Sequence, residues 1–239
     1  MERFIAKTAL LVLLLAARAS ASPATAILLG GGPDRSDAEL AMRNWKEFEE
    51  VTQELLVLPP GYPKIVDSAT IKGMAPGLAV VVAGFCAGEQ ATRVARFLRA
   101  LEPGAYTRAA VVPALACPEI ASEWQIGASV KVAAGPKNVL RVQIFDDGRK
   151  EADKESLAFA VAWLRSATEV LEAWRVGDLR CVGHTVVRLD KTRIRVLAEC
   201  VTDSCTQDEV RKMSWTLEAE DAIAVAPRVG KIIKEMECD

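Results

Sequence analysis

The chain has 239 residues and a formal net charge of −2 at pH 7, so acidic and basic side chains are almost in balance. A slightly acidic chain has no electrostatic feature that favours a nucleic-acid partner. Apolar residues make up 51% of the sequence, which is ample for a hydrophobic core, and the length suits one large domain or two small ones.

The first 21 residues have the three-part pattern of a secretory signal peptide. The basic residues Arg3 and Lys7 precede an apolar run over 8–17, and Ala19-Ser20-Ala21 then forms an A-x-A cleavage site. The apolar run is too short for a stable membrane span. We therefore expect 1–21 to be removed, which leaves an exported protein, periplasmic or extracellular, with no stable membrane span. An uncleaved N-terminal anchor helix is the alternative.

Two strand–glycine–helix units follow. The strand Ala26–Leu29 is expected to break at the glycine-rich turn that begins with Gly30, and a helix then starts at a capping box, Ser36–Glu39. The stretch Gly77–Cys86 is an apolar, β-branched run typical of a buried strand, and an amphipathic helix over 89–101 follows it. Two further strands are expected, over Lys64–Ile71 and Tyr106–Val112. This β-α-β-β-α-β order predicts a four-stranded antiparallel sheet with both helices on one face, the ferredoxin-like arrangement.

A repeated strand–glycine–helix unit in an exported chain resembles the SPOR domain, the sporulation-related repeat. The segment Val80–Phe85 is similar to the family's second glycine-containing strand, and Ala91 and Leu98 match its helix positions. The resemblance covers about residues 24–115, and it implies that the open face of the sheet binds peptidoglycan glycan strands that lack stem peptides. The first half departs from the family pattern at Leu29–Gly32, where a polar residue, a glycine and an aromatic residue are usual.

Candidate ligand-binding side chains flank this predicted sheet. Phe85 and Tyr106 offer aromatic faces that suit the apolar faces of sugars, and Lys64 and Arg108 offer hydrogen-bond donors. An envelope protein is the alternative partner. A polar groove lined by aromatic residues would favour cell-wall glycan, and a flat apolar patch would favour a protein.

After a linker expected over 116–127, the pattern changes to a second α+β domain over 128–239, in which no family resemblance is evident. Residues 150–174 contain no glycine or proline and have apolar residues at helical spacing, which predicts one helix. The remaining pattern is mostly the alternation of antiparallel strands. The strands are expected over Ser129–Ala133, Val139–Phe145, Cys181–Arg188, Arg193–Val201, Arg211–Leu217 and Ala222–Ala226. The predicted fold class is therefore α+β, a ferredoxin-like βαββαβ domain followed by an antiparallel-sheet domain with one helix.

Six cysteines in an exported chain indicate disulfides. Pairing between neighbours within each domain predicts Cys86–Cys117, Cys200–Cys205 and Cys181–Cys238. A structural zinc site of Cys181, His184, Cys200 and Cys205 is the alternative, and a hairpin over 181–201 would place Cys181 opposite Cys200 or its neighbours, as a cross-strand disulfide also requires. In an oxidising compartment disulfides are favoured over zinc.

No catalytic motif stands out, and no cofactor is expected. His184 is the single histidine, so any Ser-His-Asp or Cys-His mechanism would need it, yet it lies in a predicted strand where a packed histidine is the simpler interpretation. Asp146, Asp147 and Asp190 fall in predicted turns, where aspartates cap backbone groups. The leading hypothesis is a non-enzymatic exported envelope protein that binds glycan. A disulfide-stabilised interaction or scaffold protein and a hydrolase with a site around His184 are the alternatives.

Overall fold

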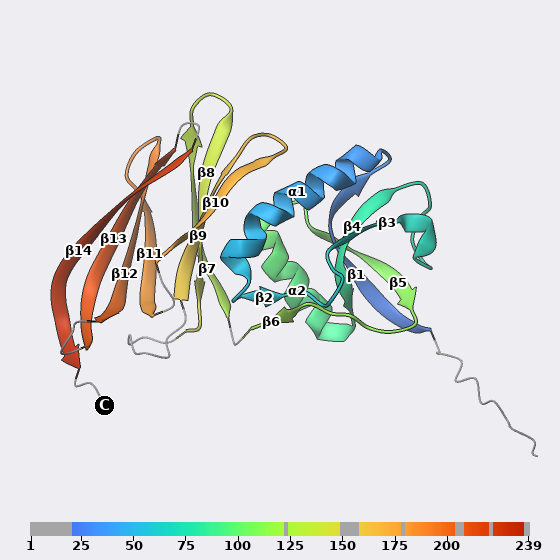
Figure 1. The fold of residues 1–239 in the computed structure, drawn as a ribbon, viewed down its shortest axis with the longest axis horizontal. Coiled ribbons are helices and arrows are strands. Elements are labelled where there is room, and N and C mark those ends of the chain that lie inside the picture. Colours follow the sequence, from blue (N-terminus) through green and yellow to red (C-terminus); the bar gives the residue numbers. More distant parts are fainter. Residues whose placement is uncertain are drawn as a thin grey trace, which may run out of the picture.

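The computed structural model describes residues 21–121, 124–148, 158–177, 180–203, 208–219 and 222–236. These residues form four stacked layers: a sheet, a pair of helices, and two further sheets (Figure 1). The predicted signal peptide, 1–21, lies outside the described residues except for its last position.

The first layer is a four-stranded sheet made of β1 (Ser22–Gly32), β3 (Lys64–Asp67), β4 (Ala79–Cys86) and β5 (Tyr106–Val112). The strand order is β3-β4-β1-β5, and every neighbouring pair is antiparallel. This order, with one helix between β1 and β3 and another between β4 and β5, confirms the expected ferredoxin-like β-α-β-β-α-β arrangement. Strand β4 is buried from Val80 to Cys86, as its apolar, β-branched sequence predicted.

The glycines after Leu29 do not break β1, which corrects the expected turn. Gly30, Gly31 and Gly32 pair with Val81, Val80 and Ala79 of β4. A Cβ at position 30 would lie 2.6 Å from the Cβ of Ala41, so glycine here lets a helix approach the strand closely. The glycine-rich segment is therefore a strand that accommodates a helix.

The second layer consists of α1 (Arg35–Thr52) and α2 (Gly88–Leu101). Helix α1 starts directly after Asp34, so Ser36 lies inside the helix and the expected capping box does not form. Both helices bury apolar side chains on two sides, because one sheet lies beneath them and another above. This double burial joins the two regions that the sequence predicted as separate domains.

The third layer contains β7 (Gln125–Ala134), β8 (Asn138–Asp146), β9 (Ala158–Arg165) and β10 (Val170–Val176), in the order β10-β9-β8-β7. The helix expected over 150–174 is wrong, since 158–165 and 170–176 are strands and 149–157 lie outside the described residues. Phe159, Val161 and Trp163 of β9 pack towards the helices. Ala160, Ala162 and Leu164 pack towards the next sheet. A strand buried on both faces lacks polar alternation, so its sequence matches helical spacing equally well.

The fourth layer is the outermost sheet, β11 (Cys181–Arg188), β12 (Arg193–Asp203), β13 (Asp208–Ala219) and β14 (Ile223–Met236), in that order. These strands confirm the four that the alternating pattern predicted, although β13 and β14 are longer than expected. One face of this sheet shares an apolar core with the third layer. The described part of the second region thus contains antiparallel sheets and no helix.

The segment 116–127, expected to be a linker, contains the short strand β6 (Glu119–Ile120), which pairs with β2 (Leu56–Val57), and the start of β7.

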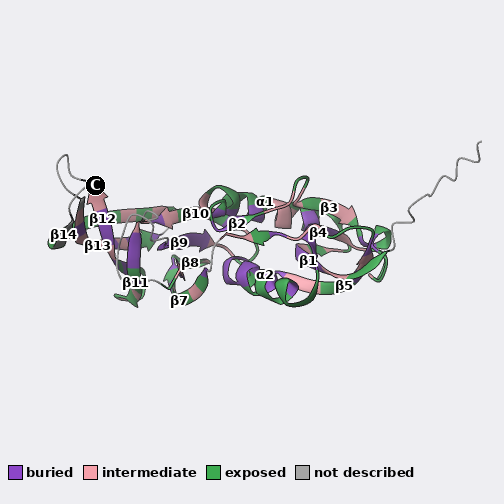
Figure 2. Ribbon diagram, turned by 90° about the horizontal axis from the view of Figure 1, so that it is seen from below, coloured by how far each residue is buried: buried purple, intermediate pink, exposed green. Residues whose placement is uncertain are grey.

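Polar contacts also tie the helices to the third layer. The side chain of Asn44 donates to the carbonyl of Thr168 at 2.9 Å and accepts from the amide of Val170 at 3.0 Å. Arg165 donates to both carboxylate oxygens of the buried Glu102, at 2.8 and 2.9 Å. Figure 2 shows β9, in the third layer, as a buried strand.

Two disulfides lie within the described residues. Cys86–Cys117 confirms the predicted pair. Cys181 bonds to Cys200, so the expected pairs Cys200–Cys205 and Cys181–Cys238 are wrong. The reason is the register of the β11–β12 hairpin, which places Cys181 directly opposite Cys200 with Cα atoms 4.0 Å apart. Cys205 and Cys238 lie outside the described residues. Disulfides of this kind indicate an oxidising compartment.

Candidate functional site

The four side chains predicted to bind a ligand share the outer face of the first sheet, opposite the helices. Directly paired residues of antiparallel strands point to the same side of a sheet. One row runs from Lys64 through Val82 and Leu28 to Tyr106. The neighbouring row is formed by Phe85, Ala26 and Arg108. Strand pairing therefore brings together residues that lie far apart in the sequence.

Aromatic rings and cations alternate on this face. The ring of Tyr62 meets that of Phe85 edge-on, with centroids 6.2 Å apart. The Nζ of Lys64 lies 4.5 Å from the centroid of the Tyr62 ring, and the guanidinium of Arg108 lies 4.8 Å from that of Tyr106. Such cation–π contacts hold the charged groups over the rings. The sequence reasoning missed Tyr62, although its position two residues before Lys64 matches the period of the following strand.

The centre of the same face is apolar and covered. Leu28 and Val82 are fully buried there. The cover comes from the segment between β3 and β4, whose Ile71, Met74 and Leu78 pack onto this cluster. The face is therefore not an open groove. Phe85 is 7% exposed and belongs to the buried cluster, so its ring is not available for the expected stacking on a sugar. The two cations and the two tyrosines lie around the closed apolar centre, where they can donate hydrogen bonds to the oxygen atoms of a ligand.

The region around His184 has the character of a packed core. The Cys181–Cys200 disulfide takes two of the four ligands of the zinc alternative, and the described residues contain no group of three or more possible metal ligands. His184 is buried beside Gly177 and Trp215, and neither ring nitrogen has a hydrogen-bond partner among the described residues. Burial lowers the pKa of His184 to about 4, so the ring is neutral at neutral pH.

Two of the turn aspartates cap backbone groups, as predicted. Asp190 accepts hydrogen bonds from the amides of Thr192 and Arg193, both at 2.9 Å, and these bonds, with the Arg193 side chain, lower its pKa to about 2. Asp146 accepts from the amide of Gly148 at 2.7 Å, while burial raises its pKa. Both carboxylates therefore have structural roles in their turns.

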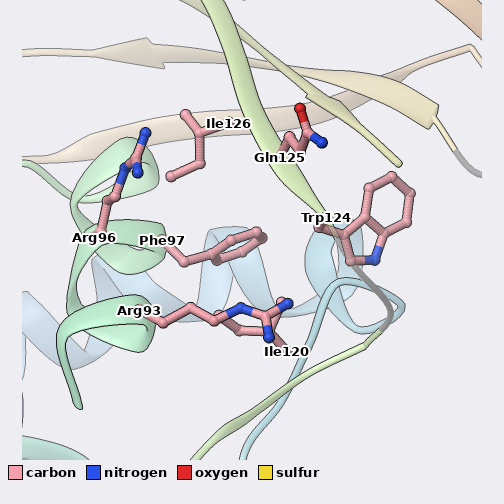
Figure 3. Close-up of a pocket in the computed structure, with 7 residues that line it drawn as sticks. All are labelled: Arg93, Arg96, Phe97, Ile120, Trp124, Gln125 and Ile126. Atoms are coloured by element: carbon pink, nitrogen blue, oxygen red, sulfur yellow. The ribbon is translucent and has the colours of Figure 1, made fainter. Parts of the chain in front are cut away.

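A second candidate site is a cavity of about 430 Å³ between α2, β6 and β7. Figure 3 shows Arg93 and Arg96 extending from α2 on either side of Phe97, with Gln125 and Ile126 of β7 on the facing side and Trp124 directly before that strand. The sequence reasoning missed this site because one of its walls comes from 116–127, which was expected to be a linker. The paired arginines on one helix face were the available signal.

A comparison with protein-family models, curated proteins and solved structures finds no match for this chain. Within the described ranges, no helix combines the length and apolar character needed to cross a membrane. The function is accordingly inferred from the surfaces of the chain itself.

Proposed function

We propose that this chain is a non-enzymatic exported protein of the bacterial envelope that binds cell-wall glycan through the outer face of its first sheet. The observation that carries the proposal is the gathering of Lys64, Phe85, Tyr106 and Arg108 on one face by strand pairing. The sequence resemblance to the SPOR domain and the ferredoxin-like strand order support the same face as the binding surface. The two disulfides support a periplasmic or extracellular location.

The closed centre of the face restricts how a glycan binds. Because Ile71 and Met74 cover the buried strands, contacts come from the rim, with Lys64 beside Tyr62 on one side and Arg108 beside Tyr106 on the other. Sugar hydroxyl and carboxylate groups accept hydrogen bonds from both cations. One face of each tyrosine ring is already occupied by a cation, so hydrogen bonding contributes more to this binding than ring stacking does.

The experiment is co-sedimentation of the purified, oxidised protein with purified peptidoglycan sacculi. The wild-type protein is expected to pellet with sacculi, and the double variant Tyr106→Ala/Arg108→Ala is expected to stay mostly in the supernatant. Trp174→Ala is the matched control, because this tryptophan is 42% exposed on β10, in the third layer. Absence of wild-type pelleting, or equal pelleting of the double variant, would overturn the proposal.

The second candidate is a disulfide-stabilised interaction or scaffold protein that binds an envelope protein. Leu28, Val80 and Val82 are fully buried beneath the covering segment, so the apolar centre of this face offers no exposed patch that would favour a protein partner over glycan. A protein of this kind would remain in the supernatant with sacculi whatever the variant. The third candidate, a hydrolase around His184, requires His184→Ala to abolish an activity without unfolding the protein. The buried, unpartnered ring does not favour that role.

A further inference from the structure

Strands β12 and β14 end at the same corner of the outermost sheet, on either side of the start of β13. Asp208, the first residue of β13, pairs with Asp203 at the end of β12 and with Met236 at the end of β14. Neighbouring strands lie about 4.8 Å apart, so the ends of β12 and β14 are separated by about 10 Å. The chain therefore leaves both strands at nearly the same place.

Two cysteines follow these strand ends in the sequence. Cys205 is two residues beyond Asp203, and Cys238 is two residues beyond Met236. Two residues span up to about 7 Å, and a disulfide joins Cα atoms that are roughly 4.4–6.8 Å apart. The register of the three strands thus allows the two thiols to meet across the gap between the strand ends.

The other four cysteines of the chain are already bonded. Cys86 joins Cys117, and Cys181 joins Cys200. Both bonds indicate an oxidising compartment, where nearby thiols are readily converted to a disulfide. A thiol of the same chain is also present at a far higher effective concentration than a thiol of a second molecule. A bond within the chain is therefore favoured for the remaining two cysteines.

We propose that Cys205 and Cys238 form a third disulfide, which ties the C-terminal end of β14 to the connection between β12 and β13. As the sulfur–sulfur bond forms, the two thiols give up two protons and two electrons. A disulfide-bearing oxidant of the compartment, such as a thiol oxidoreductase, accepts them and is reduced to two thiols. The resulting ring includes all of β13 and β14, so it also restricts the unfolded chain.

The position of this bond suits the weakest-held strand of the outermost sheet. Strand β14 pairs with β13 alone, and none of its residues over 223–233 is buried. Backbone hydrogen bonds along such an exposed edge open easily when little apolar packing supports them. A covalent bond at Cys238 fastens the free end of the strand. The proposal depends on strand register and on the compartment, so it can fail independently of the glycan-binding face.

The first test is disulfide mapping of the purified full chain, which is denatured and alkylated without reductant. Cleavage before Asp203 separates Cys205 from Cys200, and cleavage after Lys234 isolates the fragment with Cys238. Mass spectrometry is expected to find these two fragments joined, and to find no alkylated cysteine. Alkylation of both Cys205 and Cys238, or a bond from either one to a second molecule, would overturn the proposal.

The second test is hydrogen exchange of the backbone amides in the variant Cys205→Ala/Cys238→Ala. Amides of β14 are expected to exchange about a hundredfold faster than in the wild type, because the strand end is released. Amides of β8, in the third layer, are the internal reference and should change much less. The matched control is Ser204→Ala/Glu237→Ala, which alters the neighbouring positions and keeps both thiols. Equal exchange of β14 in the two variants would show that no bond fastens this strand.

Discussion

Strands β9 and β14 have opposite environments within one molecule. Every residue of β9 from Ala158 to Leu164 is buried, whereas no residue of β14 over 223–233 is buried. Strand β9 lies between the helices and the outermost sheet, while β14 is the edge of that outermost sheet (Figures 1 and 2). The comparison shows that the layer a strand occupies decides how much of its apolar surface is buried, and buried apolar surface is what stabilises the fold.

The exposed apolar residues of β14 are accompanied by features that discourage edge pairing. Val229 is 62% exposed, and Ile232 and Ile233 are 41% and 46% exposed. Pro227 has no backbone N–H to offer a neighbouring strand, and Lys231 adds a charge that resists burial. This strand therefore keeps an exposed edge in solution, in contrast to β9, which has a neighbouring strand on both sides.

The sharpest test of the comparison is Trp163→Ala in β9. Trp163 is 1% exposed, and its ring packs edge-on against Phe48 of α1 with centroids 5.5 Å apart. The loss of this side chain should lower the free energy of unfolding by about 3–5 kcal/mol, because it leaves a cavity between two layers. Trp174→Ala on the half-exposed strand β10 should cost within about 1 kcal/mol. The measurement is denaturant unfolding of both variants without reductant. If Trp163→Ala and Trp174→Ala lower the free energy of unfolding by the same amount, a core centred on β9 is contradicted.

The packing of the outermost sheet can be tested through the pH dependence of stability, because His184 lies on the face of β11 that meets the third layer. Its pKa is about 4 in the folded protein, against 6.5 for a solvated histidine, because burial disfavours the charged ring. Between these values the unfolded chain binds a proton that the folded chain does not, so stability falls as pH drops from about 6.5 to about 4. The total loss from this group is about 3 kcal/mol.

The measurement is the difference between wild type and His184→Gln in the free energy of unfolding across this pH range. Carboxylates titrate in both proteins and cancel in the difference. A difference that does not change with pH would show that His184 is solvated. It would then contradict the burial of His184 between the outermost sheet and the third layer.

The smallest effect is expected for Val229→Ala in β14. Its side chain is already mostly in water, so the free energy of unfolding should change by less than about 0.5 kcal/mol. The same change at Val161 of β9, which is fully buried, should cost about 2 kcal/mol or more. If Val229→Ala proves as costly as Val161→Ala, the edge of the sheet must be covered in solution.

The elements that were predicted correctly have one buried and one exposed face, or clear turn residues at their ends. Strand β12 is an example, since its buried apolar residues alternate with more exposed ones along a single buried face. Strand β9 was missed because both faces are buried, and its turn to β10 lacks glycine and proline. The Cys181–Cys200 pair was one of several open possibilities, because only the hairpin register places these residues directly opposite each other.

The candidate sites divide in the same way. Lys64, Phe85, Tyr106 and Arg108 could be proposed from the sequence because they lie on or beside predicted strands of one repeated unit, and strand pairing places them on one face. The cavity between α2 and β7 was not found, because Trp124 lies within the segment 116–127 that was expected to be a linker. Residues on one predicted sheet can be related by its pairing rules, but a residue in a predicted linker cannot be related to a helix in that way.

The sequence by itself determined the repeated β-α-β units, the alternating strands of the outermost sheet and the disulfide Cys86–Cys117, because these depend on local periodicity and on neighbouring elements. Only the tertiary structure decided that the helices lie between two sheets, with Asn44 and Glu102 joined to the third layer. The physical reason is that a second buried face removes the polar alternation from which a strand is recognised. The same packing forms the cavity between α2 and β7 and buries β9 on both faces.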